Sequence, residues 1–195
     1  MMRHLRTLSV ALIASSLSAC FGGAKVPPTL LNLTSSAPAT AATQRSADAG
    51  QAVTIDYPVI PKELLTTRVP AENGPTQIAY IKNLMWVETP DKLFQRLVQE
   101  TVMRATHRVV LDPRQSSLDP GLKLTGALGK FGYDAQLGAV VVRYDGALST
   151  AGGTRVETRR FEAQVPADGT ARTVGPALNA AANQVAAEIA GWIGG

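Results

Sequence analysis

The stretch TPDKLFQRLVQETVMRA, residues 89–105, decides the fold of this 195-residue chain more than any other segment. Thr89 suits the N-cap of a helix, and Pro90 suits the first helical position because its missing N–H has no intrahelical acceptor there. Mostly apolar side chains then recur at helical spacing, at positions 93, 94, 97, 98, 101, 102 and 105. The pattern predicts an amphipathic helix over residues 90–105.

A second helix is predicted at the end of the chain, over about residues 173–192. Its apolar stripe runs through Val174, Leu178, Ala181, Val185, Ile189 and Trp192. Many alanines on this segment allow close approach to a sheet. We expect Trp86, just before the first helix, to plug the core, and Leu97 and Trp192 to pack on the buried helix faces.

The remaining periodic segments read as strands. Before the first helix they are 51–60, 64–69 and 76–82, with a turn at 72–75, and residues 29–34 form a candidate short strand. After it come 107–111, a strand around residues 122–128, then 136–148 and 155–165, the last two joined by a turn at Gly152 and Gly153. Hairpins with few helices predict an α+β, two-layer domain: a mixed, mostly antiparallel sheet with both amphipathic helices on one face.

The N-terminal sequence is typical of a signal peptide followed by a lipid-attachment site. Basic residues precede an apolar run over residues 8–17, which is too short to span a bilayer and typical of a signal peptide. The run ends in Leu17, Ser18, Ala19 and Cys20, which looks like a bacterial lipobox. The alternative is an ordinary secretory signal with an unrelated cysteine. Cys20 is the only cysteine, and it occupies the position at which a lipobox cysteine receives S-diacylglycerol and N-acyl groups.

The lipobox divides the chain into a removed signal peptide (1–19), a lipidated cysteine with a short tether (20–28) and one domain (29–195, core about 51–193). Phe21 follows the cysteine, where an aspartate often signals retention in the inner membrane. We therefore expect an outer-membrane lipid anchor, with the domain facing the periplasm.

Composition excludes several function classes. Removing residues 1–19 leaves 17 basic and 15 acidic side chains, a net charge of +2, which gives little field for binding nucleic acid. A single cysteine excludes an intramolecular disulfide and a cysteine-based zinc site. His107 is the only histidine beyond the leader, and a boundary histidine is the favoured interpretation over a catalytic one. We predict no cofactor, no metal site and no catalytic residue.

Two further motifs have alternative readings. Gly126, Gly129, Gly132 and Lys130 have the wrong spacing for a phosphate-binding loop and lie in a predicted strand. The charge run over 155–162 is most often a solvated strand face, but it is also a candidate docking surface. Its arginines can make bidentate contacts to carboxylates, and they are Arg155, Arg159 and Arg160.

Taken together, the chain resembles the ABC-type transport auxiliary lipoproteins, a lipobox-bearing group associated with mammalian-cell-entry (MCE) lipid transporters. The resemblance covers about residues 29–192. It rests on Cys20 and on the segments IAYI (78–81), WVETP (86–90), LFQRL (93–97), RRF (159–161) and AAEIAGW (186–192). Leu30 and Leu31 depart from the tyrosine that many members have there.

The resemblance implies a non-enzymatic accessory subunit that docks partner proteins between the inner and outer membranes. The implied partners are an MCE-family substrate-binding protein and, through it, an ABC permease and ATPase; self-association stays open. The alternative is a periplasmic lipid-binding carrier that holds an acyl chain between sheet and helices. An apolar cavity of several hundred Å³ would favour the carrier, and a filled core would favour docking.

Overall fold

The computed structural model describes residues 26–38, 45–48, 50–113, 121–150 and 153–194. The leader, Leu17, Ser18, Ala19, Cys20 and Phe21 lie outside the described residues, as does the predicted turn residue Gly152. The elements in chain order are β1 (Ala52–Ile55), the 3-10 helix η2 (Lys62–Leu64), β2 (Arg68–Glu72), β3 (Ile78–Met85), α2 (Pro90–Ala105), β4 (Val110–Leu111), β5 (Gly121–Asp134), β6 (Ala139–Thr150), β7 (Val156–Pro166) and α3 (Ala171–Gly194).

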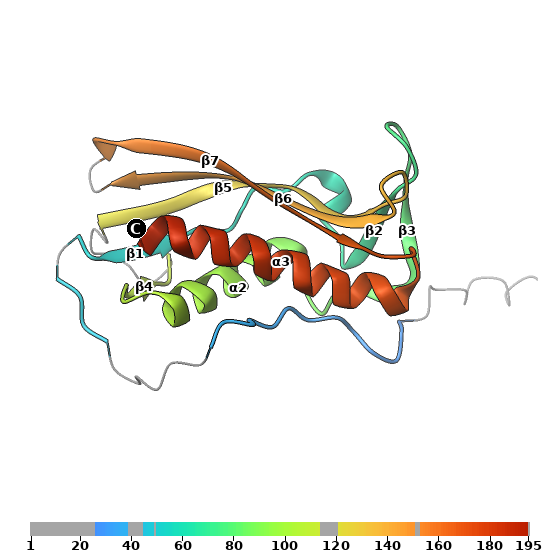
Figure 1. Ribbon diagram of the computed structural model, residues 1–195, viewed down its shortest axis with the longest axis horizontal. Helices are drawn as coiled ribbons and strands as arrows, with labels where there is room; N and C mark the ends of the chain where they lie inside the picture. The colour runs from blue at the N-terminus through green and yellow to red at the C-terminus, as the bar shows by residue number, and fades with distance from the viewer. Residues whose placement is uncertain (1–25, 39–44, 49, 114–120, 151–152, 195) are drawn as a thin grey trace, which may run out of the picture.

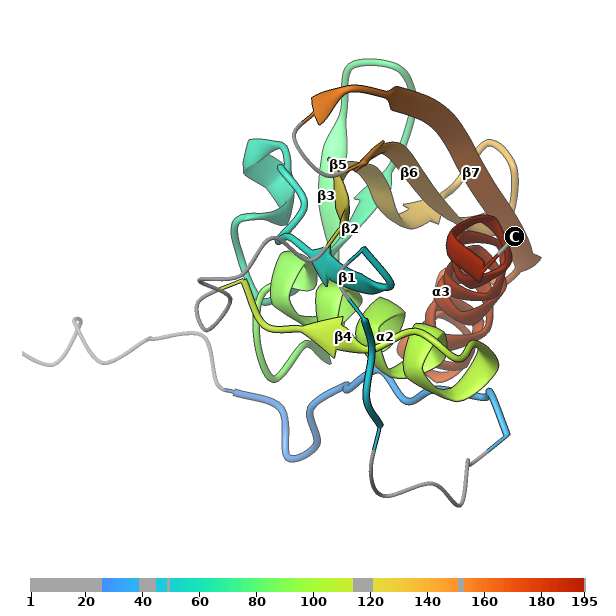
Figure 2. The same ribbon diagram turned by 90° about the vertical axis from the view of Figure 1, so that its left-hand side faces the viewer.

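The sheet is mixed, and its largest part is an antiparallel meander. Long β5, β6 and β7 pair antiparallel in sequence, and β2 pairs antiparallel with β3. Parallel pairing joins β1 to β4 and β5, and β2 to β5. Both helices lie on one face of this seven-stranded sheet, which arches over them when viewed along its length (Figures 1 and 2). The predicted α+β, two-layer architecture is confirmed.

Helix α2 occupies the predicted range. Thr89 takes the N-cap position with extended backbone angles, but its side chain makes no capping hydrogen bond; instead its carbonyl accepts from the N–H groups of Lys92 and Leu93. The predicted stripe is buried from Leu93 to Val102, with Leu97 2% exposed, but its last member, Ala105, is exposed. The amide of buried Gln95 donates to the Ile55 carbonyl at 2.9 Å, so α2 is also hydrogen-bonded to β1.

Helix α3 is longer than predicted at both ends. At its start the Asp168 carboxylate accepts from the N–H and hydroxyl of Thr170 and from the hydroxyl of Thr173, which occupies groups that an uncapped helix end leaves open. At its end, the Arg108 guanidinium donates to the Ile193 carbonyl at 2.7 Å. Ile193 is buried and Trp192 only partly so.

The core between the layers is filled by a continuous row of aromatic rings. Neighbouring ring centroids lie 5.3–6.4 Å apart along Trp86, Phe131, Phe94, Tyr144, Phe161 and Trp192. Gly126 makes room for this row, because a Cβ there would lie 2.6 Å from the Tyr144 ring. Burial raises the pKa of the Tyr144 hydroxyl, which donates to the Thr125 carbonyl at 3.0 Å. The contacts between neighbouring rings stabilise the core in addition to the large apolar area that each ring buries.

Four predicted strand boundaries were wrong. The candidate strand 29–34 is reduced to one bridge between Leu31 and Trp86, with the Leu31 N–H donating to the Met85 carbonyl. The segment 51–60 pairs continuously only in β1, after which Val59 makes one isolated bridge to Ala127.

The other two errors have a common physical cause. Residues 62–64 form η2, so the strand predicted at 64–69 begins only at Arg68. His107 is exposed in the α2–β4 loop, and only Val110–Leu111 pair, because just two residues lie alongside β1. In each case the boundary depends on pairing with a residue outside the segment itself: Arg68 pairs with Met85 of β3, and Val110 pairs with Val53 of β1.

Candidate docking surface

Strand β7 forms one edge of the sheet, and among the described residues it pairs only with β6. Successive side chains of a strand point to opposite faces. Phe161 is buried on the helix side of β7, which places Arg155 and Arg159 on that face and Arg160 on the other, open face. The three predicted docking arginines are all exposed, but they do not form one patch.

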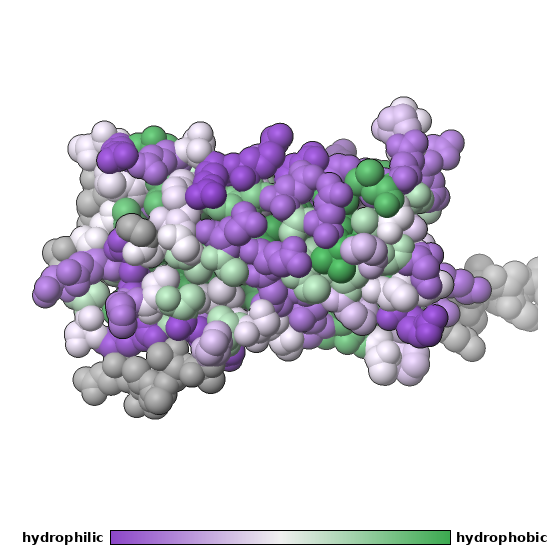
Figure 3. All heavy atoms as spheres, in the orientation of Figure 1, coloured by the Kyte–Doolittle hydropathy of each residue, from purple (hydrophilic) through white to green (hydrophobic). Residues whose placement is uncertain are grey.

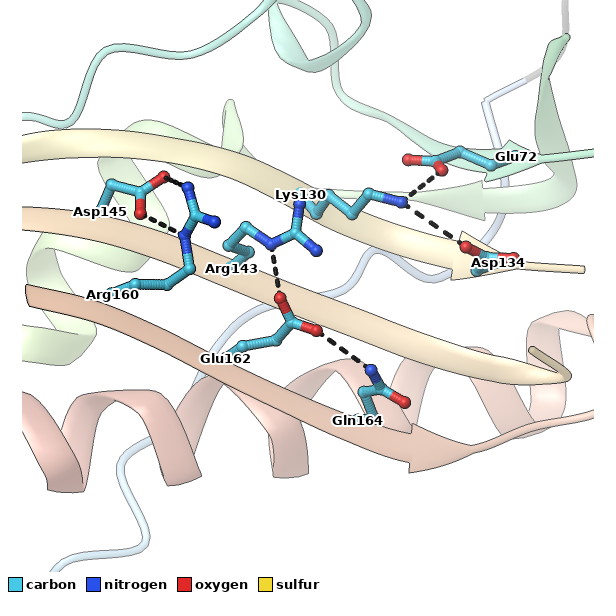
Figure 4. Close-up of polar contacts among 8 residues, drawn as sticks. All are labelled: Glu72, Lys130, Asp134, Arg143, Asp145, Arg160, Glu162 and Gln164. Atoms are coloured by element: carbon cyan, nitrogen blue, oxygen red, sulfur yellow. Dashed lines mark hydrogen bonds and ion pairs between the residues drawn. The ribbon is translucent and has the colours of Figure 1, made fainter. Parts of the chain in front are cut away.

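The open face carries a polar ladder made of three groups of contacts (Figure 4). Arg160 makes a bidentate contact with Asp145, its direct cross-strand neighbour, at 2.6 and 3.1 Å. The Arg143 guanidinium donates to Glu162, which also accepts from Gln164. The third group joins Lys130 to Glu72 at 2.6 Å and to Asp134 at 3.5 Å.

These contacts stabilise the charged forms of the side chains in the ladder. The hydrogen bond from Arg143 lowers the pKa of Glu162, and the hydrogen bond to Glu72 raises the pKa of Lys130. Exposed ion pairs contribute little stability, about 0–1 kcal/mol each. The ladder is therefore a solvated face whose charges are already paired within the chain, and a partner would have to displace these pairs to use them.

The helix-side edge of β7 offers a different arrangement. Arg155 pairs with Glu157, and Glu157 also accepts from the Trp192 indole at 3.4 Å. The Arg159 guanidinium lies 5.2 Å from the centroid of the Phe161 ring, and within the described part of the chain it has no ion pair. Arg159 is thus the one of the three arginines whose donors are available to a partner carboxylate. Figure 3 shows charged and polar side chains gathered along this edge.

Two hollows lie at the end of the molecule where the helices finish. The larger, about 720 Å³, is an open depression lined by residues 105–108 and by small residues of α3, with Gln51 at its rim. His107 lies in its wall. The smaller, about 170 Å³, is lined partly by Leu122, Leu148 and Trp192, between the sheet and α3. The smaller hollow meets the aromatic row only at Trp192, and the other members of the row are at most 2% exposed.

The described residues hold no cluster of three or more histidine, cysteine, aspartate or glutamate side chains that could bind a metal ion. Lys130 and the nearby glycines lie within β5, and the lysine is engaged with Glu72 and Asp134, so they form no phosphate loop. Within the same described ranges, no helix is long and apolar enough to cross a membrane.

Sequence reasoning missed two residues, Asn179 and Asn183, on the outer surface of α3. Asn179 accepts from the N–H of Thr34 at 2.9 Å, and Asn183 accepts from the N–H of Ser36 at 2.7 Å. The Asn183 amide also donates to the Thr34 carbonyl at 2.9 Å. Their spacing of four residues on one helix face was the available signal, but their partners lie more than 140 residues away.

Comparison with known proteins assigns this domain to a family. A family described as the ABC-type transport auxiliary lipoprotein component matches residues 31–190. The chain belongs to this family. It is accordingly a lipoprotein component auxiliary to ABC-type transport, which implies a location in the cell envelope.

Solved structures share the family's fold with this chain. Protein XCC0632 from Xanthomonas campestris, of the family DUF330, is 17% identical with a TM-score of 0.70, over 84% of this chain and 94% of that one. A crystal structure of an uncharacterized protein is 16% identical with a TM-score of 0.60, over 77% and 96% of the two chains. No curated protein matches the chain significantly.

Proposed function

We propose that this auxiliary component is a non-enzymatic docking subunit of an MCE-type lipid transport system, anchored in the outer membrane through Cys20 and facing the periplasm. Residues 1–19 are the signal peptide in this proposal, and residues 20–28 link the acylated cysteine to the domain. Its partners are an MCE-family substrate-binding protein and, through it, an ABC permease and ATPase. The match to the auxiliary lipoprotein family over residues 31–190 carries the proposal.

The packing between sheet and helices favours docking over lipid carriage. A carrier needs an apolar cavity of several hundred Å³ where an acyl chain can lie. Here that space holds the row of aromatic rings, and the hollow between sheet and α3 measures about 170 Å³. The larger depression is open and lies at the helix ends, where Thr106, His107 and Arg108 contribute polar lining. A filled core supports a role exercised at the surface.

The helix-side edge of β7 is the surface that we assign to the partner. It combines exposed strand backbone with a guanidinium, that of Arg159, which has no carboxylate partner among the described residues. Arginine donors bind a carboxylate bidentately, and an edge strand offers main-chain groups to a second chain. An acidic, extended segment of the substrate-binding protein fits these two features.

Affinity purification from mildly solubilised envelopes tests the proposal. The full-length protein should co-purify with the MCE-family protein, and Arg159→Glu should reduce recovery at least tenfold, since a hydrogen bond to a charged group is worth roughly 1.5–3 kcal/mol and about 1.4 kcal/mol is a factor of ten. Arg160→Glu is the matched control, because its side chain lies on the opposite face and is engaged with Asp145.

Three results would count against the proposal. Equal recovery with Arg159→Glu and with the unchanged protein would remove the assigned edge. Failure to recover any MCE-family protein would remove the docking role. Co-purification of stoichiometric lipid with the delipidated Cys20→Ser protein would favour the carrier instead.

A further inference from the structure

Residues 31–37, here called the strap, are fastened across the outer side of the two helices (Figure 1). Besides its hydrogen bonds to Asn179 and Asn183, the strap receives a bond from Arg104 of α2, whose guanidinium donates to the Ala37 carbonyl at 2.9 Å. The Ser35 and Thr101 hydroxyls are 3.1 Å apart. The strap is therefore bound to both helices before the chain enters β1.

The strap also has a defined starting point. Leu31 exchanges backbone hydrogen bonds with Met85 and Val87, and its side chain lies against Gly175 near the start of α3. This end of the molecule, here called the anchor pole, also carries the β2–β3 turn, the β5–β6 turn and the β7–α3 connection (Figure 1). The opposite end, here called the far pole, carries the β6–β7 connection and the C-terminal ends of both helices.

The length of the segment between Cys20 and Leu31 limits how far the anchor pole can lie from the lipid anchor. Leu31 lies eleven positions after Cys20, and this stretch spans at most about 36–40 Å when fully extended. The register of β6 with β7 places Val156 beside Ser149 and Pro166 beside Ala139, so Val156 lies about 33 Å along the sheet from the anchor pole at ~3.3 Å per residue. Because the chain from Cys20 joins the domain at the anchor pole, a tether that is less than fully extended keeps this pole closer to the membrane than the far pole.

The surface of the anchor pole suits contact with lipid. Its exposed hydrophobic side chains are Val26 and Leu30 before the strap, Ile78 at the start of β3 and Leu137 in the β5–β6 turn. Figure 3 shows hydrophobic side chains at the surface near this turn. At this end Lys130 pairs with both Glu72 and Asp134, which leaves a net charge of −1 on these three side chains.

From these observations we infer that the strap holds the domain upright, with the anchor pole resting on the lipid surface and the far pole pointing away from it. This rests on the proposed anchoring through Cys20. The orientation directs the β6–β7 end and the exposed Arg155 into the periplasm. An approaching protein therefore meets the far pole first, and the lipid surface covers the apolar side chains at the anchor pole.

Energy transfer to labelled lipids measures this orientation. Because Cys20 is the only cysteine and is acylated in the proposal, a single introduced cysteine can be labelled alone. The full-length protein is expressed with Leu137→Cys or with Val156→Cys, labelled with a donor dye and reconstituted in phosphatidylcholine vesicles that carry acceptor-labelled headgroups. With a dye pair whose Förster distance is close to the spacing of the two sites, transfer from position 137 should be at least twofold more efficient.

Strap-release variants make the test specific. Asn179→Ala with Asn183→Ala and Leu33→Ser should bring the two transfer efficiencies together, because Leu33 is buried and holds the strap as well, and the released strap lengthens the tether. Gln184→Ala, an exposed neighbour on α3, should leave the difference unchanged. Ile78→Cys provides a second site at the anchor pole should Leu137→Cys fail to fold.

The possible results separate the orientation from the anchoring. Equal or reversed transfer in a protein whose acyl groups are confirmed by mass spectrometry would overturn the orientation alone. Persistence of the difference after strap release would show that the strap does not set it, which also contradicts the inference. A mass spectrum without acyl groups on Cys20 would overturn the proposed anchoring, and the inference with it.

Discussion

Truncating Leu97 to alanine tests whether α2 packs as described. Leu97 is 2% exposed and lies among the buried side chains of α2 that face the core. The change removes three carbon atoms, which corresponds to roughly 2.4 kcal/mol at about 0.8 kcal/mol per buried methylene. A residual cavity of about 50 Å³ would add roughly 1 kcal/mol, at about 24 cal/mol per Å³. We therefore expect the free energy of unfolding to fall by about 2.5–4 kcal/mol.

Urea denaturation followed by far-UV circular dichroism measures this change. The assay uses the mature chain with Cys20→Ser, so that no acyl group complicates the transition. With a slope of about 2 kcal/mol/M, the midpoint of Leu97→Ala should fall by roughly 1–2 M urea at an unchanged slope. Met103→Ala is the matched control, because Met103 lies on the same helix but is 40% exposed, and we expect a loss below about 1 kcal/mol.

One result would refute the packing argument. If Leu97→Ala and Met103→Ala lose the same free energy at equal slopes, the two faces of α2 are equivalent and the helix does not lie on the sheet as described. A changed slope alone would show instead that the variant altered the surface exposed on unfolding.

Three further predictions concern sorting, the histidine and pH. Phe21→Asp should move the protein to inner-membrane fractions on a density gradient in a host that follows the aspartate rule; unchanged fractions would remove the basis for outer-membrane sorting. His107→Ala should cost less than about 0.5 kcal/mol and leave co-purification intact, since the side chain is exposed; loss of transport at normal stability would revive a catalytic interpretation. Hydrogen bonds from Thr170 and Thr173 lower the pKa of Asp168 to about 2, so its contribution is present above pH 3.8 and is lost as pH falls through about 2. The stability gap between the unchanged protein and Asp168→Asn should accordingly close between pH 4 and pH 2 in thermal melts; a constant gap would contradict this.

Local signals in the sequence predicted the helices well. The range of α2 matches the prediction because the proline at its start and the 3.6-residue pattern both lie within the segment itself. The long hairpins were predictable for the same reason, since β5 pairs with β6 and β6 pairs with β7, in the order of the chain. The boundaries of β1 and β2 were not, because β1 pairs in parallel with β4 and β5, which are distant in sequence, and the start of β2 depends on its pairing with Met85 of β3.

The docking residues show a signal that was present but not used. Arg155 and Arg159 lie four positions apart, an even number, whereas Arg160 lies one position after Arg159. Because side chains of a strand alternate between its two faces, this spacing already places Arg160 on the face opposite to the other two arginines. What the sequence does not contain is the pairing of each guanidinium. Asp145 and Glu157 engage two of the arginines, and only the folded chain shows that Arg159 is left with an aromatic ring.

The strap and the core restrain the helices from opposite sides, and this separates two kinds of perturbation. Leu97 and the aromatic rings lie between helices and sheet, whereas Asn183 meets the strap on the outer surface of α3. Losing the strap contacts removes the burial of Leu33 and a few hydrogen bonds, each worth about 0.5–1.5 kcal/mol, and leaves the packing of Leu97 and the aromatic rings in place. Strap variants should therefore change how the domain stands on the membrane while the domain stays folded, and core variants should do the reverse. A docking subunit needs both properties, because a folded edge strand can meet its partner only if the domain presents it in the right direction.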